Sequence, residues 1–251
     1  MTSATKINQM LQNLPYGAVL LSAWLKEQGY SFSLQQNYRQ SGWLRSIGKG
    51  AMVRTGQKLL LFGAVSALQN QVGIAVHIGG RTALGLSGYA HYLEIRNKDT
   101  LVFTSRGTHI PSWLKNNIWD SNPHIIETNF LPAEAGLEDF EQNGITVKIS
   151  SPARAIMECL ELAPDKFDLT EAWEIMQGLS LLQPVSVNEL LVRCKSVKVK
   201  RLFMHFAWKA GHAWFNKINP YNIDLGKGKR SFVRNGVYLP DYMITLPQHL
   251  G

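Results

Sequence analysis

The chain contains little cysteine, and its two cysteines are poorly placed for metal binding or cross-linking. Cys159 and Cys194 are the only ones among 251 residues, and neither belongs to a CxxC pair or to a Cys/His group with metal-ligand spacing. The sequence therefore predicts neither a disulfide framework nor a zinc site. We expect both side chains to be buried as small hydrophobic groups.

Long apolar runs are also absent. No segment approaches the roughly 20 consecutive apolar residues that span a bilayer, and the stretch from Met1 to Lys6 is not followed by an apolar signal core. We therefore expect a cytoplasmic protein with no membrane partner. Because 45% of its residues are hydrophobic, the chain is able to bury the core of one large domain or of two ordinary ones.

The motifs of common catalytic sites are missing too. There is no GxSxG elbow, and Gly226–Ser231 lacks the four-residue gap between glycines of a phosphate-binding loop. His205 and His212 share a helix face, but no third metal ligand lies near them in the sequence. We predict a protein that is not an enzyme and that binds no cofactor or metal.

Acidic residues are scarce in two of three regions of the chain. The net charge is +8, and residues 1–56 hold six basic residues against the single acid Glu27. Residues 120–192 hold thirteen acids against three basic residues, whereas residues 193–234 hold eleven basic residues against Asp224. Two basic regions favour a polyanionic partner such as nucleic acid. Solvated helix faces on an ordinary soluble protein are the alternative.

The first region has the pattern of a small helical domain. Apolar spacing predicts helices over residues 6–14, 18–28 and 34–40, with Ser33 as the cap of the third. Two short strands around a glycine-containing basic turn are predicted over residues 46–54. Three helices followed by a hairpin are the layout of a winged helix-turn-helix domain, in which the third helix enters the major groove.

The residue types of this domain suit DNA recognition. Leu34 and Tyr38 lie one turn apart and are expected to point inward. The remaining side chains of the third helix then face outward, where glutamine pairs with adenine edges and arginine with guanine edges, while basic residues of the hairpin contact phosphates. The predicted DNA-binding residues are Ser33, Gln35, Gln36, Arg39, Gln40, Arg45, Lys49 and Arg54.

The rest of the chain predicts a second, larger α+β domain with early strands and late helices. Strands are expected over residues 74–78, 101–104, 125–130 and 145–149, and helices over residues 59–71, 81–90, 151–162, 170–178, 187–194 and 199–215. We therefore divide the chain into a winged helix-turn-helix domain at residues 1–57, a linking helical segment at residues 58–95 and an α+β domain at residues 96–251.

Several segments, taken in order, resemble the AbiEi-type antitoxins of abortive-infection toxin–antitoxin systems. The resemblance implies a protein that represses its own operon by binding inverted repeats in the promoter, and that counters a nucleotidyltransferase-like toxin through residues 96–251. It assigns Gln35, Gln36 and Arg39 to base reading, and the basic hairpin residues to backbone contact. The segments are Pro15–Gly17, Tyr38–Leu44, Gly48–Ala51, His77–Leu84, Ser151–Ala155, Ala210–Phe215 and Asp224–Arg230.

A basic C-terminal face is the second candidate site. It is expected to form a second DNA contact, or a surface for the toxin or for an RNA that the toxin modifies. Two alternatives use the same face. One is a nucleic-acid-processing enzyme with metal bound in the acidic middle region, and the other is a pure protein-interaction module. The residues of the basic face are Lys195, Lys198, Lys200, Arg201, Lys227, Lys229 and Arg230.

Overall fold

The computed structural model describes residues 6–89 and 99–251. These residues form helices together with parallel and antiparallel strands, which confirms the predicted α+β class. No helix in these two ranges is long and apolar enough to cross a membrane. The chain passes repeatedly between two compact units. The first comprises Met1–Ile78, Ile95–Glu127 and Asp139–Ile149, and the second comprises Gly79–Glu94, Thr128–Glu138 and Ser150–Gly251.

The N-terminal part of the first unit combines three helices with a small antiparallel sheet of order β1-β3-β2. Apolar side chains from all three helices and from all three strands close over one core, which contains Leu20, Leu25, Tyr38, Leu44 and Met52. The elements are α1 (Lys6–Gln12), β1 (Val19–Leu21), α2 (Ser22–Glu27), α3 (Phe32–Gln40), β2 (Leu44–Gly48) and β3 (Ala51–Arg54).

Several boundaries in this region differ from the sequence prediction, and two of these differences have a clear cause. Residues 19–21 form strand β1 and not the start of the second helix, because their backbone pairs with β3 through Val19 and Val53. The third helix begins at Phe32, two residues earlier than expected. Its cap is Ser31, whose hydroxyl accepts a hydrogen bond from the backbone N–H of Leu34 at 3.3 Å.

A five-stranded sheet of order β6-β5-β4-β8-β7 occupies much of the first unit, and α4 contacts both β1 and β4. Four of its strands match the four predicted ones. Strand β7 was not predicted, because half of the residues in its sequence LEDFEQ are charged and none of its side chains is buried. The elements are α4 (Leu61–Val72), β4 (Val76–Ile78), β5 (Asp99–Thr104), α6 (Ser112–Asn116), β6 (Asn122–Glu127), β7 (Leu137–Gln142) and β8 (Ile145–Ser150).

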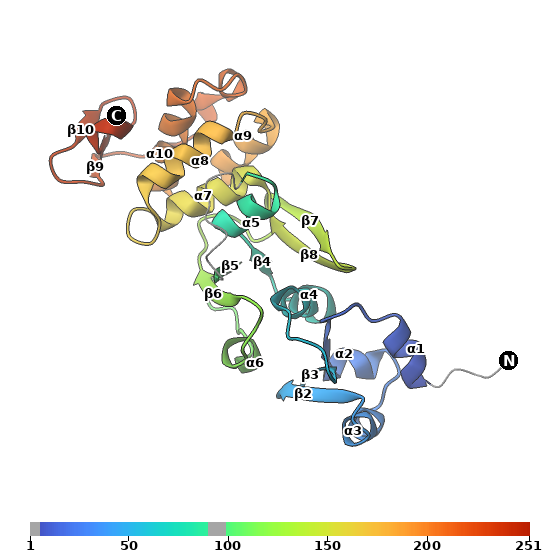
Figure 1. Ribbon diagram of the computed structural model, residues 1–251. Coiled ribbons are helices and arrows are strands. Elements are labelled where there is room, and N and C mark those ends of the chain that lie inside the picture. The colour runs from blue at the N-terminus through green and yellow to red at the C-terminus, as the bar shows by residue number, and fades with distance from the viewer. Residues whose placement is uncertain (1–5, 90–98) are drawn as a thin grey trace. The chain divides into compact units, whose positions relative to one another are not determined.

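The second unit is mainly helical, and Figure 1 shows α7, α8, α9 and α10 gathered together. Helix α7 contacts α5, α8, α9 and α10, and it begins with the predicted Ser151 cap and Pro152. A small sheet of order β10-β11-β9 follows these helices and was not predicted. The elements are α5 (Gly80–Leu86), α7 (Pro152–Leu162), α8 (Leu169–Gly178), α9 (Pro184–Arg193), α10 (Val197–Lys209), β9 (Arg230–Ser231), β10 (Val237–Leu239) and β11 (Ile244–Leu246).

A buried ion pair lies in the core of the second unit. Arg154 Nε lies 2.8 Å from Glu158 Oε1 on α7, and the side chains are 4% and 0% exposed. The other carboxylate oxygen of Glu158 accepts hydrogen bonds from Gly80 N at 2.8 Å and Ser150 Oγ at 2.7 Å. These contacts fix α5 and the end of β8 on α7. The Ser151–Ala155 segment of the resemblance therefore has a structural role.

Candidate nucleic-acid interface

Helix α3 presents one polar, solvent-exposed side. Tyr38 is buried and Leu34 partly buried, as predicted, whereas Gln36, Arg39 and Gln40 are exposed. Ser33 is also exposed, but it lies inside the first turn of the helix and is not its cap. The side predicted to read bases is therefore open to a ligand at these four positions.

Gln35 does not belong to that side, and the prediction that it faces outward is wrong. Its side chain is 0% exposed. Its Oε1 accepts a hydrogen bond from Ser22 Oγ at 2.5 Å, and its Nε2 donates to the backbone oxygens of Ser22 and Tyr30 at 3.0 and 2.7 Å. Gln35 therefore fixes the angle between α2 and α3. The clue in the sequence is the spacing, because Gln35 lies three residues before the inward-facing Tyr38 and shares its face.

The β2–β3 hairpin carries the three predicted basic residues. Arg45 and Lys49 are exposed, and Arg54 is partly buried. The strand register shifts between Ser46 and Gly48, an irregularity of the kind that bends a strand and increases its twist. Ser46 Oγ donates to Gly48 O at 3.2 Å and accepts from Gly48 N at 3.4 Å. Lys49 therefore stands on a hairpin tip of defined shape.

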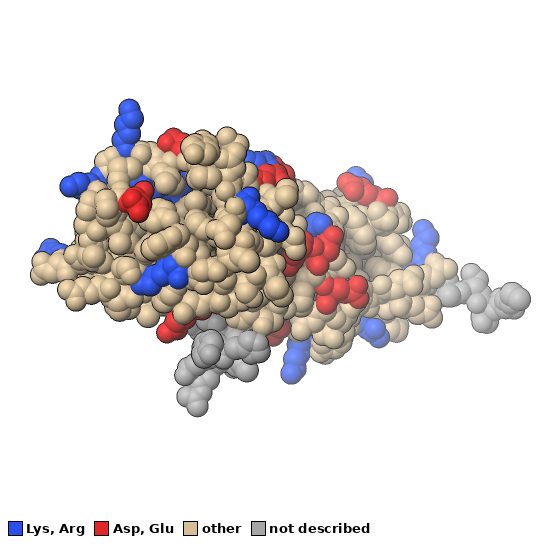
Figure 2. All heavy atoms as spheres, turned by 90° about the horizontal axis from the view of Figure 1, so that it is seen from above, with Lys and Arg blue, Asp and Glu red and all other residues tan. Residues whose placement is uncertain are grey.

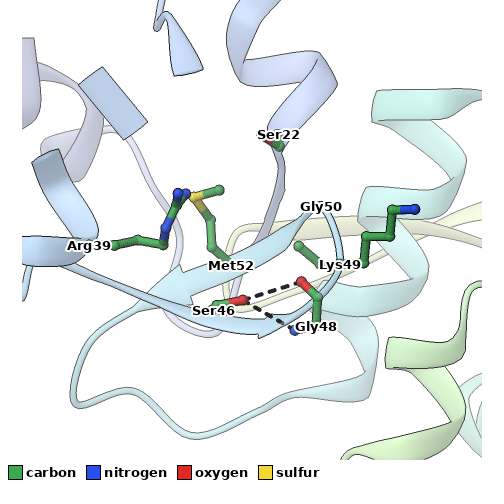
Figure 3. A pocket seen from close by; sticks show the side chains of 8 residues that line it. Ser22, Arg39, Ser46, Gly48, Lys49, Gly50 and Met52 are labelled. Carbon is green, nitrogen blue, oxygen red and sulfur yellow. Dashed lines mark hydrogen bonds between the residues drawn. The ribbon is translucent and has the colours of Figure 1, made fainter. Parts of the chain in front are cut away.

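Helix α3 and the hairpin border the same hollow, which has a volume of about 310 Å³. Figure 3 shows Arg39 extending from α3 toward Met52, whereas Lys49 at the hairpin tip points away from Arg39. The hollow thus has one cation on its helix side and another at its hairpin side. Such an arrangement can meet a polyanion such as DNA, with Arg39 and Lys49 at separate points of contact. The lining residues are Ser22, Arg39, Ser46, Gly48, Lys49, Gly50, Ala51 and Met52.

The basic C-terminal face is smaller than the sequence predicted. Lys200 and Arg201 are buried, at 6% and 0% exposure, and Lys198 is partly buried. The expectation that these three cations form an open face is wrong. On the face seen in Figure 2, lysine and arginine side chains stand apart and do not merge into one basic patch. The exposed members of the predicted set are Lys195, Lys227, Lys229 and Arg230.

Backbone oxygens hold two of these cations, the buried Arg201 and the partly buried Lys198. Arg201 Nε donates to Leu225 O at 2.7 Å, and its Nη1 donates to Gly228 O at 2.7 Å and Met243 O at 3.2 Å. Lys198 Nζ donates to Glu161 O at 2.5 Å and Ala163 O at 2.8 Å. Burial lowers the pKa of both side chains below their ordinary values. Arg201 thereby joins α10 to the loops around the C-terminal sheet.

Metal and thiol chemistry find no support in the described parts of the chain. Among residues 6–89 and 99–251, no group of three or more His, Cys, Asp or Glu side chains is placed to hold a metal ion. The metal-dependent enzyme alternative required such a group. Cys159 and Cys194 are both buried and free, as predicted. Burial raises the pKa of the Cys194 thiol to about 11, so it stays protonated at neutral pH.

Comparison with known proteins identifies the family. Residues 3–95 match the family model described as "Transcriptional regulator, AbiEi antitoxin N-terminal domain", and residues 97–247 match that described as "Transcriptional regulator, AbiEi antitoxin, Type IV TA system". The comparison with curated proteins gave no match.

Among solved structures, the chain is similar to the crystal structure of RV2827C protein from Mycobacterium tuberculosis, with a TM-score of 0.60. The match covers 95% of this chain and 88% of that chain at 13% identity, so it supports the fold alone. The two family models together cover nearly all of the sequence. The chain therefore belongs to the AbiEi family of transcriptional regulators, the antitoxins of type IV toxin–antitoxin systems.

Proposed function

We propose that the N-terminal part of the chain is a winged helix-turn-helix domain that binds double-stranded promoter DNA. Helix α3 docks in the major groove, where Gln36 and Gln40 pair with adenine edges and Arg39 with a guanine edge. The wing is the β2–β3 hairpin, and its Arg45 and Lys49 contact phosphates. The observation that carries the proposal is that Arg39, from the exposed polar side of α3, and Lys49, from the basic hairpin, line one hollow.

We infer further that the promoter is that of the protein's own operon and that the site contains inverted repeats. The family description supports transcriptional regulation, and the sequence resemblance supports autorepression. Residues 96–251 supply the antitoxin function against a nucleotidyltransferase-type toxin, and they do so without catalysis. Ser33 and Arg54 complete the DNA surface, and the exposed lysines near the C-terminus remain the candidate second contact.

The test is a titration of the full-length protein with its promoter DNA and with scrambled DNA, over a salt series. Arg39→Ala should weaken promoter binding by roughly 5- to 150-fold, because one bidentate arginine–guanine contact contributes about 1–3 kcal/mol. Lys49→Ala should weaken the binding of promoter and scrambled DNA by similar factors. It should also lower the slope of log affinity against log salt concentration by about 0.9. The matched control is Lys166→Ala, because Lys166 is an exposed lysine of the second unit.

The outcomes separate the DNA-binding role from a structural one. Loss of promoter preference in Arg39→Ala, with Lys166→Ala unchanged, supports the proposal. Equal binding of promoter and scrambled DNA by the wild-type protein contradicts it. The antitoxin assignment has its own readout: cells that produce the toxin should still be protected by the Arg39→Ala, Lys49→Ala variant, because the proposal places protection outside the DNA surface.

A further inference from the structure

A segment more than sixty residues away in sequence is fastened to the proposed wing. Gly48, at the end of β2, has a φ of +145°, and a Cβ atom built on it would lie 2.6 Å from Trp113 Cβ of α6. The wing backbone therefore rests directly on Trp113, which is 4% exposed. Asn117 adds a polar link, because its Nδ2 donates to Ile47 O at 2.7 Å and to Trp113 O at 2.6 Å.

The same segment is also fixed on its C-terminal side. Asp120 Oδ1 accepts a hydrogen bond from Leu61 N at 2.8 Å, and Asp120 N donates to Leu59 O at 3.0 Å. The indole of Trp119 donates to Leu114 O at 2.8 Å and meets the Trp113 ring at 6.2 Å between centroids. The segment is thus held both by the wing and by the chain that leads from the wing into α4.

The outer side of this segment has the chemistry of a nucleic-acid contact. Residues 105–120 contain the two basic residues Arg106 and Lys115 and one acid, Asp120, whose carboxylate accepts the hydrogen bond from Leu61 N. Lys115 and Asn116 are exposed, and Ile118 is 93% exposed although its neighbours Asn117 and Trp119 are fixed by hydrogen bonds. A fully exposed isoleucine in a well-anchored segment leaves its apolar surface in water unless a partner covers it. Isoleucine is among the apolar side chains that proteins place against the minor groove.

We propose that the segment from Ser112 to Ile118 is a second DNA-contacting element that extends the wing. Lys115 pairs with a backbone phosphate outside the part covered by the hairpin, Asn116 bonds to the same backbone, and Ile118 packs against the minor groove. The proposal rests on the proposed winged-helix function and adds a partner contact to it. It places part of the DNA surface in the region matched by the second family model.

The test compares Lys115→Ala, Ile118→Ser and the control Lys166→Ala on promoter DNA. Losing one phosphate contact lowers the slope of log affinity against log salt concentration by about 0.9. A fourfold rise in salt concentration should therefore reduce the promoter affinity of the wild type about 3.5-fold more than that of Lys115→Ala. Ile118→Ser should weaken promoter binding without changing the salt slope. Footprints of both variants should lose protection at the outer edge of the site, while Lys166→Ala behaves as wild type.

Failure of this inference is distinguishable from failure of the proposed function. If the wild type prefers promoter DNA and Arg39→Ala destroys that preference, but both segment variants match Lys166→Ala, the segment is not a DNA contact and only this inference is overturned. If Ile118→Ser changes the oligomeric mass and leaves the footprint intact, the segment is a protein contact, which also overturns it. Melting curves of each variant ensure that binding is compared between folded proteins.

Discussion

Removing the carboxylate of Glu158 should destabilise the protein far more than removing an exposed carboxylate with the same helical spacing to an arginine. In the Glu158→Ala variant the guanidinium of Arg154, which is 4% exposed, keeps its charge without a counter-charge. Gly80 N and Ser150 Oγ lose their acceptor at the same time. Breaking a buried ion pair from one side costs about 3–5 kcal/mol, and the orphaned donors place this variant in the upper half of that range.

The assay is thermal unfolding followed by circular dichroism. For a chain of this size, a loss of about 4–5 kcal/mol corresponds to a fall in Tm of roughly 8–20 °C. The control is Glu189→Ala, because Glu189 and Arg193 have the same four-residue spacing on α9 but exposed side chains. Exposed pairs contribute little to stability, so the control should melt close to the wild type.

A double variant isolates the pair itself. Arg154→Leu combined with Glu158→Leu removes both charges, so no unpaired charge stays in the core. The carbonyls of Pro132, Ala133 and Ala135 lose a donor in this variant, and some destabilisation is therefore expected. The double variant should nevertheless lose less stability than the sum of the two single leucine variants. A fall in Tm of less than 2 °C for Glu158→Ala would refute the stabilising role of this ion pair. Strictly additive losses of stability from the two leucine substitutions would refute it as well.

Two further predictions address other parts of the structure. Gln35→Ala should lower stability by about 1–3 kcal/mol, because the backbone oxygens of Ser22 and Tyr30 each lose a buried donor and the Ser22 hydroxyl loses its acceptor. Gln36→Ala should instead change promoter preference and leave Tm within error. Equal melting temperatures of the two variants would contradict this. Burial, with a contribution from Lys209, lowers the pKa of His205 below its ordinary 6.5. The contribution of His205 to the free energy of unfolding is therefore complete above about pH 6.5 and is lost as the pH falls toward the folded-state pKa. His205→Asn should flatten the dependence of Tm on pH between about pH 7 and 5.

Local signals were enough to predict most of the elements that carry the proposed interface. Apolar spacing of 3.6 residues gives helix α3 and its inward residue Tyr38, and glycines around Lys49 give the hairpin turn. The same signals failed at β1, because three apolar residues fit a helix as well as a strand. Only the partner strand β3, more than thirty residues later, decides between the two.

Burial of polar side chains was the least predictable property. Residues 199–207 of α10 are all buried, including Lys200 and Arg201. A helix with one apolar stripe normally leaves its cations in water. Here Arg201 is instead bonded to backbone oxygens of Leu225, Gly228 and Met243 around the small C-terminal sheet. That sheet gave no signal in the sequence because its strands contain only two or three residues.

The proposed DNA-binding surface depends on residues well beyond the hairpin. The free edge of β1 is completed by one side chain of α4, because Gln71 Oε1 accepts from Leu21 N at 2.8 Å and its Nε2 donates to Val19 O at 2.7 Å. Trp113 and Asn117 also support the hairpin. A fragment cut at residue 57 would lack all three supports. The domain boundaries at residues 57 and 95 therefore stay a prediction from the sequence. We expect the smallest fragment that binds DNA like the full chain to extend past Asn117.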